Sequence, residues 1–410
     1  MFPKKKLSEI AEIYNGNSIN KTVKQQNYMK DVPGWNYIGT KDVDFDGTVT
    51  YKTGVIIPFT ETKFRTAPAG TVFVCSEGGS AGKKTAIIKE EVCFGNKLYA
   101  IVNSRRLFIP QYVYYYTRYE EFLKQFKLKA STLMGGITAK NFGMIELPLP
   151  DICEQQRIVS RIEELFSSLD NAVETLQKTK EQLTVYRQAV LKEAFEGKLT
   201  NSKKIKQGIV GDFIEKPRYG TSKKCDYQEG DAFMDVYRIP NIDAKSGVLS
   251  HTDIKRAKFT EKELENLDLK TGDILIIRSN GSPSIVGTAA MVRENDINGT
   301  FAGYLMRVRI TETAILMPKF LLFYLSSFDA RTYIERVSKS TSGVNNINAQ
   351  EVSKIPIPVY DVAVQSAIVT EIESRISLCD QIEKTVNAAL TQAEAMRQSI
   401  LKEAFEGRLA

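Results

Sequence analysis

The nonapeptide LKEAFEGKL occupies residues 191–199 and returns 210 positions later as LKEAFEGRL at residues 401–409, with eight of nine residues identical. At the same offset, IVSRIEELFSSLD (158–170) resembles IVTEIESRISLCD (368–380). A period of this length far exceeds the roughly 20–50 residues of solenoid repeats. The sequence therefore contains a duplicated unit in which a globular region is followed by a helix.

Upstream of the helical segments, the two copies share a frame but differ in detail. LPLP (147–150) matches IPIP (355–358), and AGTVFVCSEGGSAGKKTAII (69–88) matches TGDILIIRSNGSPSIVGTAAMV (271–292) more loosely. Both longer segments predict a Gly turn, an apolar strand, a polar loop rich in Gly and Ser, and another strand. One frame with two sets of loops suits a protein that uses a single architecture to recognise two different targets.

Each copy ends in a long helix, predicted from apolar residues that recur every three or four positions in an a/d heptad. Neither stretch contains Pro or Gly, and Gly197 and Gly407 follow the last periodic residues, where helices commonly end. Thr179 interrupts the first stripe, and Arg375 fills one core position of the second. The predicted seam residues are Ile158, Ile162, Leu165, Leu169, Leu176, Leu183, Ile368, Ile372, Ile382, Val386, Met396 and Ile400.

A helix with one narrow apolar stripe needs a partner, and the partner that we expect for each helix is the other one. The order domain, helix, domain, helix requires the chain to return, which an antiparallel pair achieves. The alternative is that each helix packs its apolar stripe onto its own domain, as an ordinary core helix does.

The expected fold class is therefore α+β. Two α/β domains are separated by two long helices that form an antiparallel coiled coil, with a pseudo-two-fold internal repeat. The predicted domains are residues 1–150 and 201–356, and the predicted helical regions are residues 151–200 and 357–410.

Positive charge is concentrated in the two globular regions. Residues 1–150 contain 21 Lys and Arg against 13 Asp and Glu, and residues 201–358 have a net charge of +4. The helical regions 151–200 and 359–410 carry net charges of −2 and −3. A polyanion bound by the globular regions, with the helices turned toward protein partners, accounts for this distribution.

Four polar loops supply candidate DNA contacts: SEGGSAGKK (76–84), STLMGGITAKN (131–141), RSNGSPS (278–284) and STSGVNNINAQ (340–350). Glycine lets the backbone approach phosphate, Lys and Arg can meet phosphate or guanine, and Asn and Gln can read adenine edges. For any single residue, a plain turn position is the alternative. The predicted DNA-binding residues are Lys83, Lys84, Thr138, Lys140, Asn141, Arg278, Asn280, Ser282, Asn345, Asn346 and Gln350.

Sequence motifs for catalysis and cofactor binding are missing. GGSAGKKT (78–85) resembles a P-loop, but Glu77 stands at the first Gly position and Lys84 at the Ser/Thr position. The sequence has no G-x-G-x-x-G motif, and it lacks the adjacent prolines that the catalytic motif of amino-methyltransferases requires. The single histidine, His251, cannot supply a two-histidine metal site, and we expect it in a solvated loop. These absences favour a binding protein without a catalytic or metal site.

The cysteines and the hydropathy bear on the cellular location. The five cysteines are far apart and never form a CxxC pair, which favours reduced thiols in a cytoplasm. No run of about 18 apolar residues predicts a membrane span, and no apolar stretch follows the basic N-terminal run as in a signal peptide. We therefore expect a cytoplasmic protein.

In combination, these features resemble the specificity subunits of Type I restriction-modification systems. The resemblance rests on LPLPDICEQQRIV (147–159), the long helix after it, its ending LKEAFEGKL, and the return of this pattern at the C-terminal end, so it covers essentially the whole chain. The second copy departs from the pattern, because IPIPVYDVAVQSAIV lacks the Glu before Gln365. This difference raises the question of whether both copies contact partner subunits equivalently.

The resemblance implies a non-catalytic subunit without a cofactor of its own. Each globular region would be a target recognition domain that reads one half of a split target in double-stranded DNA. The helices would dock two modification subunits, which bind S-adenosylmethionine and methylate adenine. Restriction subunits that use ATP and magnesium would join this core.

Two other classes of function compete with this interpretation. A coiled-coil scaffold or adaptor whose globular ends bind proteins would also have two copies and two apolar stripes, but basic globular regions beside acidic helices favour DNA. A self-sufficient nuclease or methyltransferase disagrees with the missing motifs.

Overall fold

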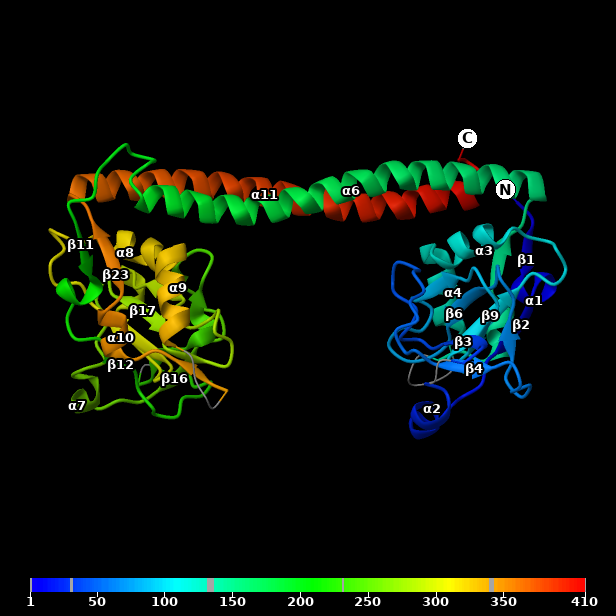
Figure 1. Cartoon of the computed structure of the whole chain (residues 1–410), viewed down its shortest axis with the longest axis horizontal. Coiled ribbons are helices and arrows are strands. Elements are labelled where there is room, and N and C mark those ends of the chain that lie inside the picture. Colours follow the sequence, from blue (N-terminus) through cyan, green and yellow to red (C-terminus); the bar gives the residue numbers. More distant parts are fainter. Residues whose placement is uncertain (1, 30–31, 131–135, 231, 339–342, 410) are drawn as a thin grey trace. The chain divides into compact units, whose positions relative to one another are not determined.

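A computed structural model describes residues 2–29, 32–130, 136–230, 232–338 and 343–409. The chain divides into two compact units (Figure 1). Unit 1 combines Met1–Gln177 with Asn387–Ala410, and unit 2 is Lys178–Val386. Two long helices, α6 (Ile152–Phe195) and α11 (Val362–Phe405), each contribute one segment to each unit.

Unit 1 is built on two four-stranded sheets. The first has the antiparallel order β2-β9-β6-β7, and the second has the order β4-β3-β8-β5, in which β3 and β8 run parallel. The strands are β1 (Lys4–Lys6), β2 (Glu12–Asn15), β3 (Gly34–Ile38), β4 (Ile56–Pro58), β5 (Thr66–Ala67), β6 (Val72–Cys75), β7 (Thr85–Ile87), β8 (Val92–Phe94), β9 (Leu98–Val102) and β10 (Glu146–Pro148). The short helices are α1 (Leu7–Ile10), α2 (Lys21–Asn27), α3 (Pro110–Thr117), α4 (Glu120–Lys129) and α5 (Ala139–Gly143).

Unit 2 has the same kind of frame. Its largest sheet has the order β12-β21-β17-β19-β15-β14, and a second sheet has the order β16-β13-β20, in which β13 and β20 run parallel. The strands are β11 (Lys206–Ile209), β12 (Arg218–Tyr219), β13 (Met234–Tyr237), β14 (Ile242–Asp243), β15 (Val248–Leu249), β16 (Lys255–Ala257), β17 (Ile274–Ile277), β18 (Ser279–Asn280), β19 (Ala289–Met291), β20 (Thr300–Phe301), β21 (Leu305–Val308), β22 (Asn345–Asn346) and β23 (Pro356–Val359). The helices are η1 (Val210–Asp212), α7 (Glu261–Leu264), η2 (Ile239–Asn241), η3 (Glu294–Asp296), α8 (Pro318–Leu325), α9 (Phe328–Val337) and α10 (Ala349–Ser353).

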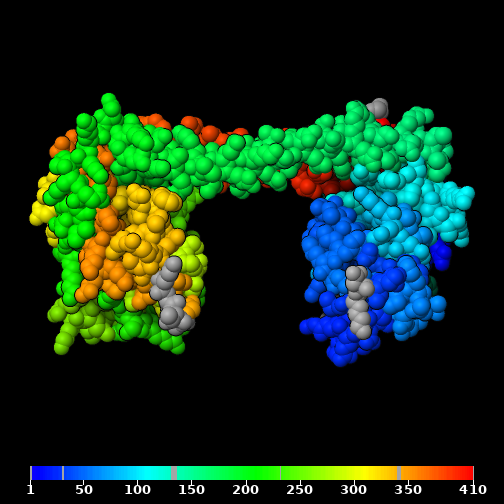
Figure 2. All heavy atoms as spheres, viewed as in Figure 1, coloured from blue at the N-terminus to red at the C-terminus, as the bar shows by residue number. Residues whose placement is uncertain are grey.

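The position of the short helices within each unit is visible in Figures 1 and 2. In unit 1, α3 lies beside the long-helix segments, whereas α2 projects from the opposite end of the unit and appears dark blue on its surface. In unit 2, α8 lies near the long-helix segments, and α7 lies at the opposite end.

The duplication predicted from the sequence is confirmed down to single glycines. Gly82 and Gly287 each close the polar loop after an apolar strand by donating their N–H to the carbonyl of Cys75 or Ile277, at 2.8 Å in both units. Both have a positive φ, +69° and +85°. A Cβ on Gly82 would lie 2.9 Å from Phe126, and one on Gly287 would lie 2.8 Å from Ile334. Only glycine therefore allows the loop to approach α4 in unit 1 and α9 in unit 2 this closely.

The predicted helix ends at Gly197 and Gly407 are also confirmed. Both glycines have a φ of +75°. Gly197 donates its N–H to the carbonyl of Ala194, and Lys198 donates to Glu193. The same two bonds recur at Gly407 and Arg408, which donate to Ala404 and Glu403. This pattern is a Schellman motif, which satisfies the last carbonyls of the helix.

Within each unit, the segments of α6 and α11 run antiparallel. In unit 1, Ile158 and Ile162 share a core with Leu401, and further along α6 Asp170 forms an ion pair with Arg397. In unit 2, Arg187 lies 2.7 Å from Asp380, and the later residue Leu191 shares a core with the earlier residue Ile372. The α+β class with two long helices is thus confirmed.

The burial of the predicted seam residues falls into three groups. The buried residues are Ile158, Ile162, Leu183, Ile368, Ile372 and Val386, and the half-buried residues are Leu165, Leu169, Leu176 and Ile400. Ile382 and Met396 are exposed, at 37% and 48%. Their neighbours Glu383 and Arg397 are half-buried instead.

Candidate nucleic-acid interface

The two polar segments predicted as DNA contacts in unit 2 lie side by side. Strand β18 pairs antiparallel with β22, which sets Asn280 opposite Asn345 and Ser279 opposite Asn346. The N–H of Ile347 donates to the carbonyl of Arg278 at 2.8 Å and extends this ribbon. The short pairing gathers Arg278, Asn280, Asn345 and Asn346 at one place, although about 65 residues separate them in sequence.

Arg278 is held in a defined position at the base of this ribbon. Its Nη1 donates to the carbonyl of Gly303 at 3.1 Å, and its guanidinium lies 4.6 Å from the centre of the Tyr219 ring. The Tyr219 hydroxyl in turn accepts a hydrogen bond from the N–H of Ala349 at 3.0 Å. An arginine restrained in this way can present its remaining N–H groups to a guanine edge or a phosphate with little further loss of entropy.

The amides of the ribbon are used only in part by the loop itself. Asn280 Oδ1 accepts from the N–H of Ser282 at 2.9 Å, and Asn345 Nδ2 donates to the carbonyl of Gly281 at 3.1 Å. Ser282 Oγ also lies 2.9 Å from Ser284 Oγ. Within the described residues, the Asn280 nitrogen and the Asn345 oxygen have no partner, so each amide retains a group for reading a base.

The remaining predicted contacts of unit 2 lie at the surface. Asn346 and Gln350 are exposed. Gln350 lies in the first turn of α10, where its N–H donates to the side chain of the capping residue Asn348 at 2.9 Å.

In unit 1, the two predicted loops also meet, but fewer of their side chains are free. Ile137 donates its N–H to the carbonyl of Ser76 at 3.1 Å, which joins the two loops. Thr138 caps α5 by accepting from the N–H of Asn141, and Asn141 Nδ2 donates to the carbonyl of Lys129 at 3.0 Å. These two polar side chains therefore have local structural partners.

The lysines of unit 1 differ in their surroundings. Lys84 Nζ donates to the carbonyl of Thr40 at 3.2 Å and lies 5.0 Å from the centre of the Phe45 ring. Lys83 and Lys140 are exposed. Residues 131–135 and 340–342 of the predicted loops lie outside the described residues.

Tyr219 is a site residue that sequence reasoning missed. A signal was present, because RYGTS (218–222) corresponds to YNGNS (14–18) in the first copy. Added Cβ atoms at the two glycines, Gly220 and Gly16, would lie 2.3 and 1.9 Å from backbone oxygens of Phe301 and Phe94. The residue before each glycine, Tyr219 or Asn15, thus occupies a matched position in its unit, and Tyr219 contacts the polar segments.

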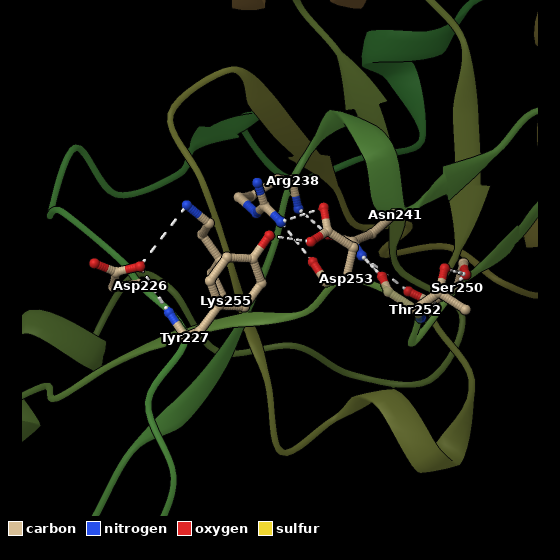
Figure 3. A network of polar contacts seen from close by, with 8 residues as sticks. All are labelled: Asp226, Tyr227, Arg238, Asn241, Ser250, Thr252, Asp253 and Lys255. Atoms are coloured by element: carbon tan, nitrogen blue, oxygen red, sulfur yellow. Dashed lines mark hydrogen bonds and ion pairs between the residues drawn. The ribbon is translucent and has the colours of Figure 1, made fainter. Parts of the chain in front are cut away.

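A second polar group missed by sequence reasoning is the network of unit 2 in Figure 3. Asp253 accepts from the Tyr227 hydroxyl and from Arg238 Nη2, the latter at 3.0 Å. The hydrogen bond from Tyr227 and then the one from Arg238 lower the pKa of Asp253. Lys255 lies 4.8 Å from the centre of the Tyr227 ring. The charge of Arg238 is therefore balanced inside the protein.

His251 lies in an exposed loop, as expected, and it also has a partner within the fold. Its side chain is partly exposed, but Nε2 lies 2.7 Å from Oδ1 of Asp296, whose side chain is fully buried. Asp296 also accepts from the N–H of Arg293 at 2.7 Å. The His251 loop is therefore held by a buried carboxylate that lies 45 positions later in the sequence. The local sequence around His251 does not predict this contact.

The described part of the chain contains neither a metal-binding cluster nor a membrane-spanning helix. No group of three or more His, Cys, Asp or Glu residues there has the arrangement of a metal site. No helix there has the length and apolar character needed to span a membrane.

Comparisons with known proteins agree on one family. Residues 2–185 match the model of the Type I restriction modification DNA specificity domain. The chain is similar to the specificity subunit of the Type I restriction enzyme EcoKI from Escherichia coli strain K12, with 27% identity over 347 residues, 80% of this chain and 73% of that protein. It is also similar to the StySPI specificity subunit from Salmonella potsdam, with 26% identity over 309 residues, 73% of this chain and 65% of that subunit, slightly less than two thirds of its length.

A solved structure from a study of complex assembly and conformational transition in the type I R-M system has the same fold. It superposes with a TM-score of 0.76, a sequence identity of 16%, and coverage of 99% of this chain and 98% of that chain.

Proposed function

We propose that the chain is a specificity subunit of a Type I restriction-modification system, which the family match over residues 2–185 and the similarity to the EcoKI and StySPI subunits support. In this proposal, its two units each read one half of a split target in double-stranded DNA. The observation that carries the proposal is the repeated frame with different loops. The loop between the matched ends Cys75 and Gly82 contains Gly78 and Gly79, whereas the loop between Ile277 and Gly287 contains Arg278 and Asn280. One scaffold with two sets of polar groups is suited to two different half-sites.

The proposed recognition combines two kinds of contact. Exposed lysines such as Lys83 and Lys140 neutralise phosphate and position the protein without reading sequence. Arg278, Asn280 and Asn345 offer the donors and acceptors that distinguish base edges in the major groove. The recognition domains of the proposal are residues 1–150 and 201–356, and the helical regions are residues 151–200 and 357–410.

The chain itself is a non-catalytic subunit, and chemistry is the task of its partners. Two modification subunits would bind S-adenosylmethionine and methylate adenine, and restriction subunits would use ATP and magnesium. A cytoplasmic location is part of the same proposal, supported by the odd number and wide spacing of the cysteines.

Selection of bound duplexes tests this function. The chain is assembled with its modification subunits, incubated with a random duplex library at a stated salt concentration, and the retained DNA is sequenced. We expect two short blocks of fixed sequence separated by an unspecified spacer, and we expect the chain alone neither to methylate nor to cut DNA. Retention without any sequence preference, or no retention at low salt, would contradict the proposal and favour a protein-binding scaffold.

A further inference from the structure

A hollow of about 250 Å³ in unit 1 is lined by three lysines from three separate segments. Lys24 comes from α2, Lys41 from the turn after β3, and Lys97 from the connection between β8 and β9. Tyr37 also lines the hollow, as does the backbone of Gly39. This volume is below the range of roughly 300–1,000 Å³ for pockets that hold small organic ligands, and it is adequate for a phosphate group.

The positive charge of this hollow has little compensation. Within the described residues, neither Lys24 nor Lys41 forms an ion pair, while Lys97 lies 2.9 Å from Glu77. The Lys24 ammonium is 4.4 Å from the centre of the Tyr37 ring. Burial lowers the pKa of Lys24, the charge of Asp42 opposes this shift, and the charge of Lys41 adds to it. The ammonium groups of Lys24 and Lys41 therefore repel each other, and a bound anion would reduce this repulsion.

Asp42, the carboxylate that acts on Lys24, is committed to the fold. It is fully buried, and its two oxygens accept hydrogen bonds from the backbone N–H groups of Gly39, at 2.8 Å, and Thr53, at 3.0 Å. The Thr53 hydroxyl donates to the same carboxylate at 3.1 Å. A buried carboxylate that holds a turn in place is not available to close an ion pair at the surface.

The matching turn of unit 2 is arranged differently. The parallel pairs Ile38–Phe94 and Tyr237–Phe301 align Gly39 with Arg238, and the N–H of Arg238 donates to Asn241 Oδ1 just as that of Gly39 donates to Asp42. In unit 2, however, a guanidinium extends from this position and pairs with Asp253 at 3.0 Å (Figure 3). Unit 2 therefore neutralises charge at this turn internally, and unit 1 leaves it unpaired.

We propose that the hollow of Lys24, Lys41 and Lys97 binds a phosphate group of the DNA backbone, and that unit 1 thereby has a backbone anchor that unit 2 lacks at the matching turn. The inference rests on the proposed function and adds the chemical group that this surface takes. It also assigns a role to α2, which projects from unit 1 at the end away from the long helices (Figures 1 and 2). Such a contact contributes affinity but no sequence preference.

A salt titration of the assembled complex tests the anchor. In the double variant Lys24→Gln/Lys41→Gln, we expect the slope of log K against log salt to fall in magnitude by about 0.9, because the hollow binds one phosphate and each phosphate contact contributes about 0.9. Affinity for every duplex should fall by the same factor, and the selected target should not change. Lys52→Gln/Lys63→Gln removes the same formal charge from lysines already paired with Asp44 and Glu61, so we expect a smaller change in slope.

Each outcome decides one of the two statements. A wild-type complex without sequence preference overturns the proposed function, whereas a specific wild type whose slope survives in Lys24→Gln/Lys41→Gln overturns the anchor alone. Equal loss of slope in the control pair also overturns the anchor, since it would reflect general charge. If the double variant is unstable, the single variant Lys41→Gln still tests the anchor. Lys41 is exposed, so its substitution should leave the fold intact.

Lysine acetylation gives a readout on the wild-type protein and separates DNA from a free anion. We expect target duplex to protect Lys24 and Lys41 from acetylation, while Lys52 stays reactive. Protection by inorganic phosphate at constant ionic strength, without protection by the duplex, would mean that the hollow holds a small free anion and would overturn the DNA anchor.

Discussion

Gln155 and Gln365 are fully buried, and each joins three backbone groups at the start of a long helix. Gln155 Oε1 accepts from the N–H of Ile109 at 2.8 Å, and its Nε2 donates to the carbonyls of Leu107 and Pro150. Gln365 makes the corresponding three bonds, to Met317, Ile315 and Tyr360. The glutamine of the duplicated motif therefore anchors the helix to its domain in both copies. The missing Glu before Gln365 leaves this anchor intact.

Replacing one of these glutamines should be costly. Gln155→Leu leaves one N–H and two carbonyls without their partner, and each buried unsatisfied group costs about 1–3 kcal/mol. We expect the free energy of unfolding to fall by on the order of 3 kcal/mol, measured by chemical denaturation. Gln156→Leu changes an exposed neighbour and should stay within about 0.5 kcal/mol. Equal effects of the two substitutions would contradict the anchoring role.

The ribbon of unit 2 should control only one half of the target. Arg278→Gln combined with Asn280→Ala removes from that ribbon a restrained guanidinium and an amide that the loop uses only in part. Because a bidentate base contact discriminates by about 1–3 kcal/mol, we expect relaxed preference at one or two positions of a single half-site. Duplex selection with the assembled complex measures this, and loss of preference in both halves would refute the assignment.

At the residue scale, the loops were easier to predict than the roles of their side chains. The polar composition of the loops predicted Arg278, Asn280 and Asn345 as candidate DNA contacts, and the fold brings the three residues together. It could not reveal that Lys84 donates to Thr40 or that Asn141 donates to Lys129, because these partners are distant in sequence. Lys24 and Lys41 lie outside the loops, and only the folded turn after β3 brings them together.

At the scale of elements, the two helices were predicted well and the face that they bury less well. The heptad pattern assigned Ile382 to the seam, but Ile382 is 37% exposed, and the next residue, Glu383, is half-buried and lies 2.8 Å from Arg187. The same shift by one residue occurs from Met396 to Arg397. A straight α-helix drifts by about 20° per heptad, so its buried face advances by one position after two or three heptads. Charged residues such as Glu383 and Arg397 then lie on the partly buried face of the helix, where a strict heptad predicts apolar side chains.

Paired substitutions distinguish a straight stripe from a strict heptad. Val386 is buried, whereas Ile382 is exposed, although the heptad assigns both to the seam. We expect Val386→Gln to lower the free energy of unfolding by about 1–3 kcal/mol, because an amide loses water without gaining a partner. Ile382→Gln should change it by about 0.5 kcal/mol or less. Similar losses in thermal and chemical unfolding for both variants would support the strict heptad instead.

At the scale of the whole molecule, each unit takes part of its core from both copies of the repeat. Phe405, near the end of the second copy, packs in unit 1 against Tyr112, Tyr116 and Tyr119, with ring centres 5.1–5.8 Å apart. Phe195, its counterpart in the first copy, packs in unit 2 against Phe320 and Tyr324. The start of each helix packs on its own domain, and its end packs on the other one. The sequence could not decide this, because both domains offer a similar apolar helix, IPQYVYYY (109–116) and MPKFLLFY (317–324).

This exchange of helix ends predicts that a substitution destabilises the unit in which its side chain is buried, even when that unit is distant in sequence. Phe405→Ala should destabilise unit 1, and Phe195→Ala should destabilise unit 2, each by about 3–5 kcal/mol, because a large ring is lost from a packed core. Hydrogen exchange resolved by peptide separates the two effects. Phe405→Ala should raise exchange in α3 and α4 and leave α8 and α9 unchanged, and Phe195→Ala should do the reverse. If each helix instead packed entirely on the domain that precedes it, Phe405→Ala would raise exchange in α8 and α9. The two variants serve as matched controls for each other, since they remove the same ring from the same position of the repeat.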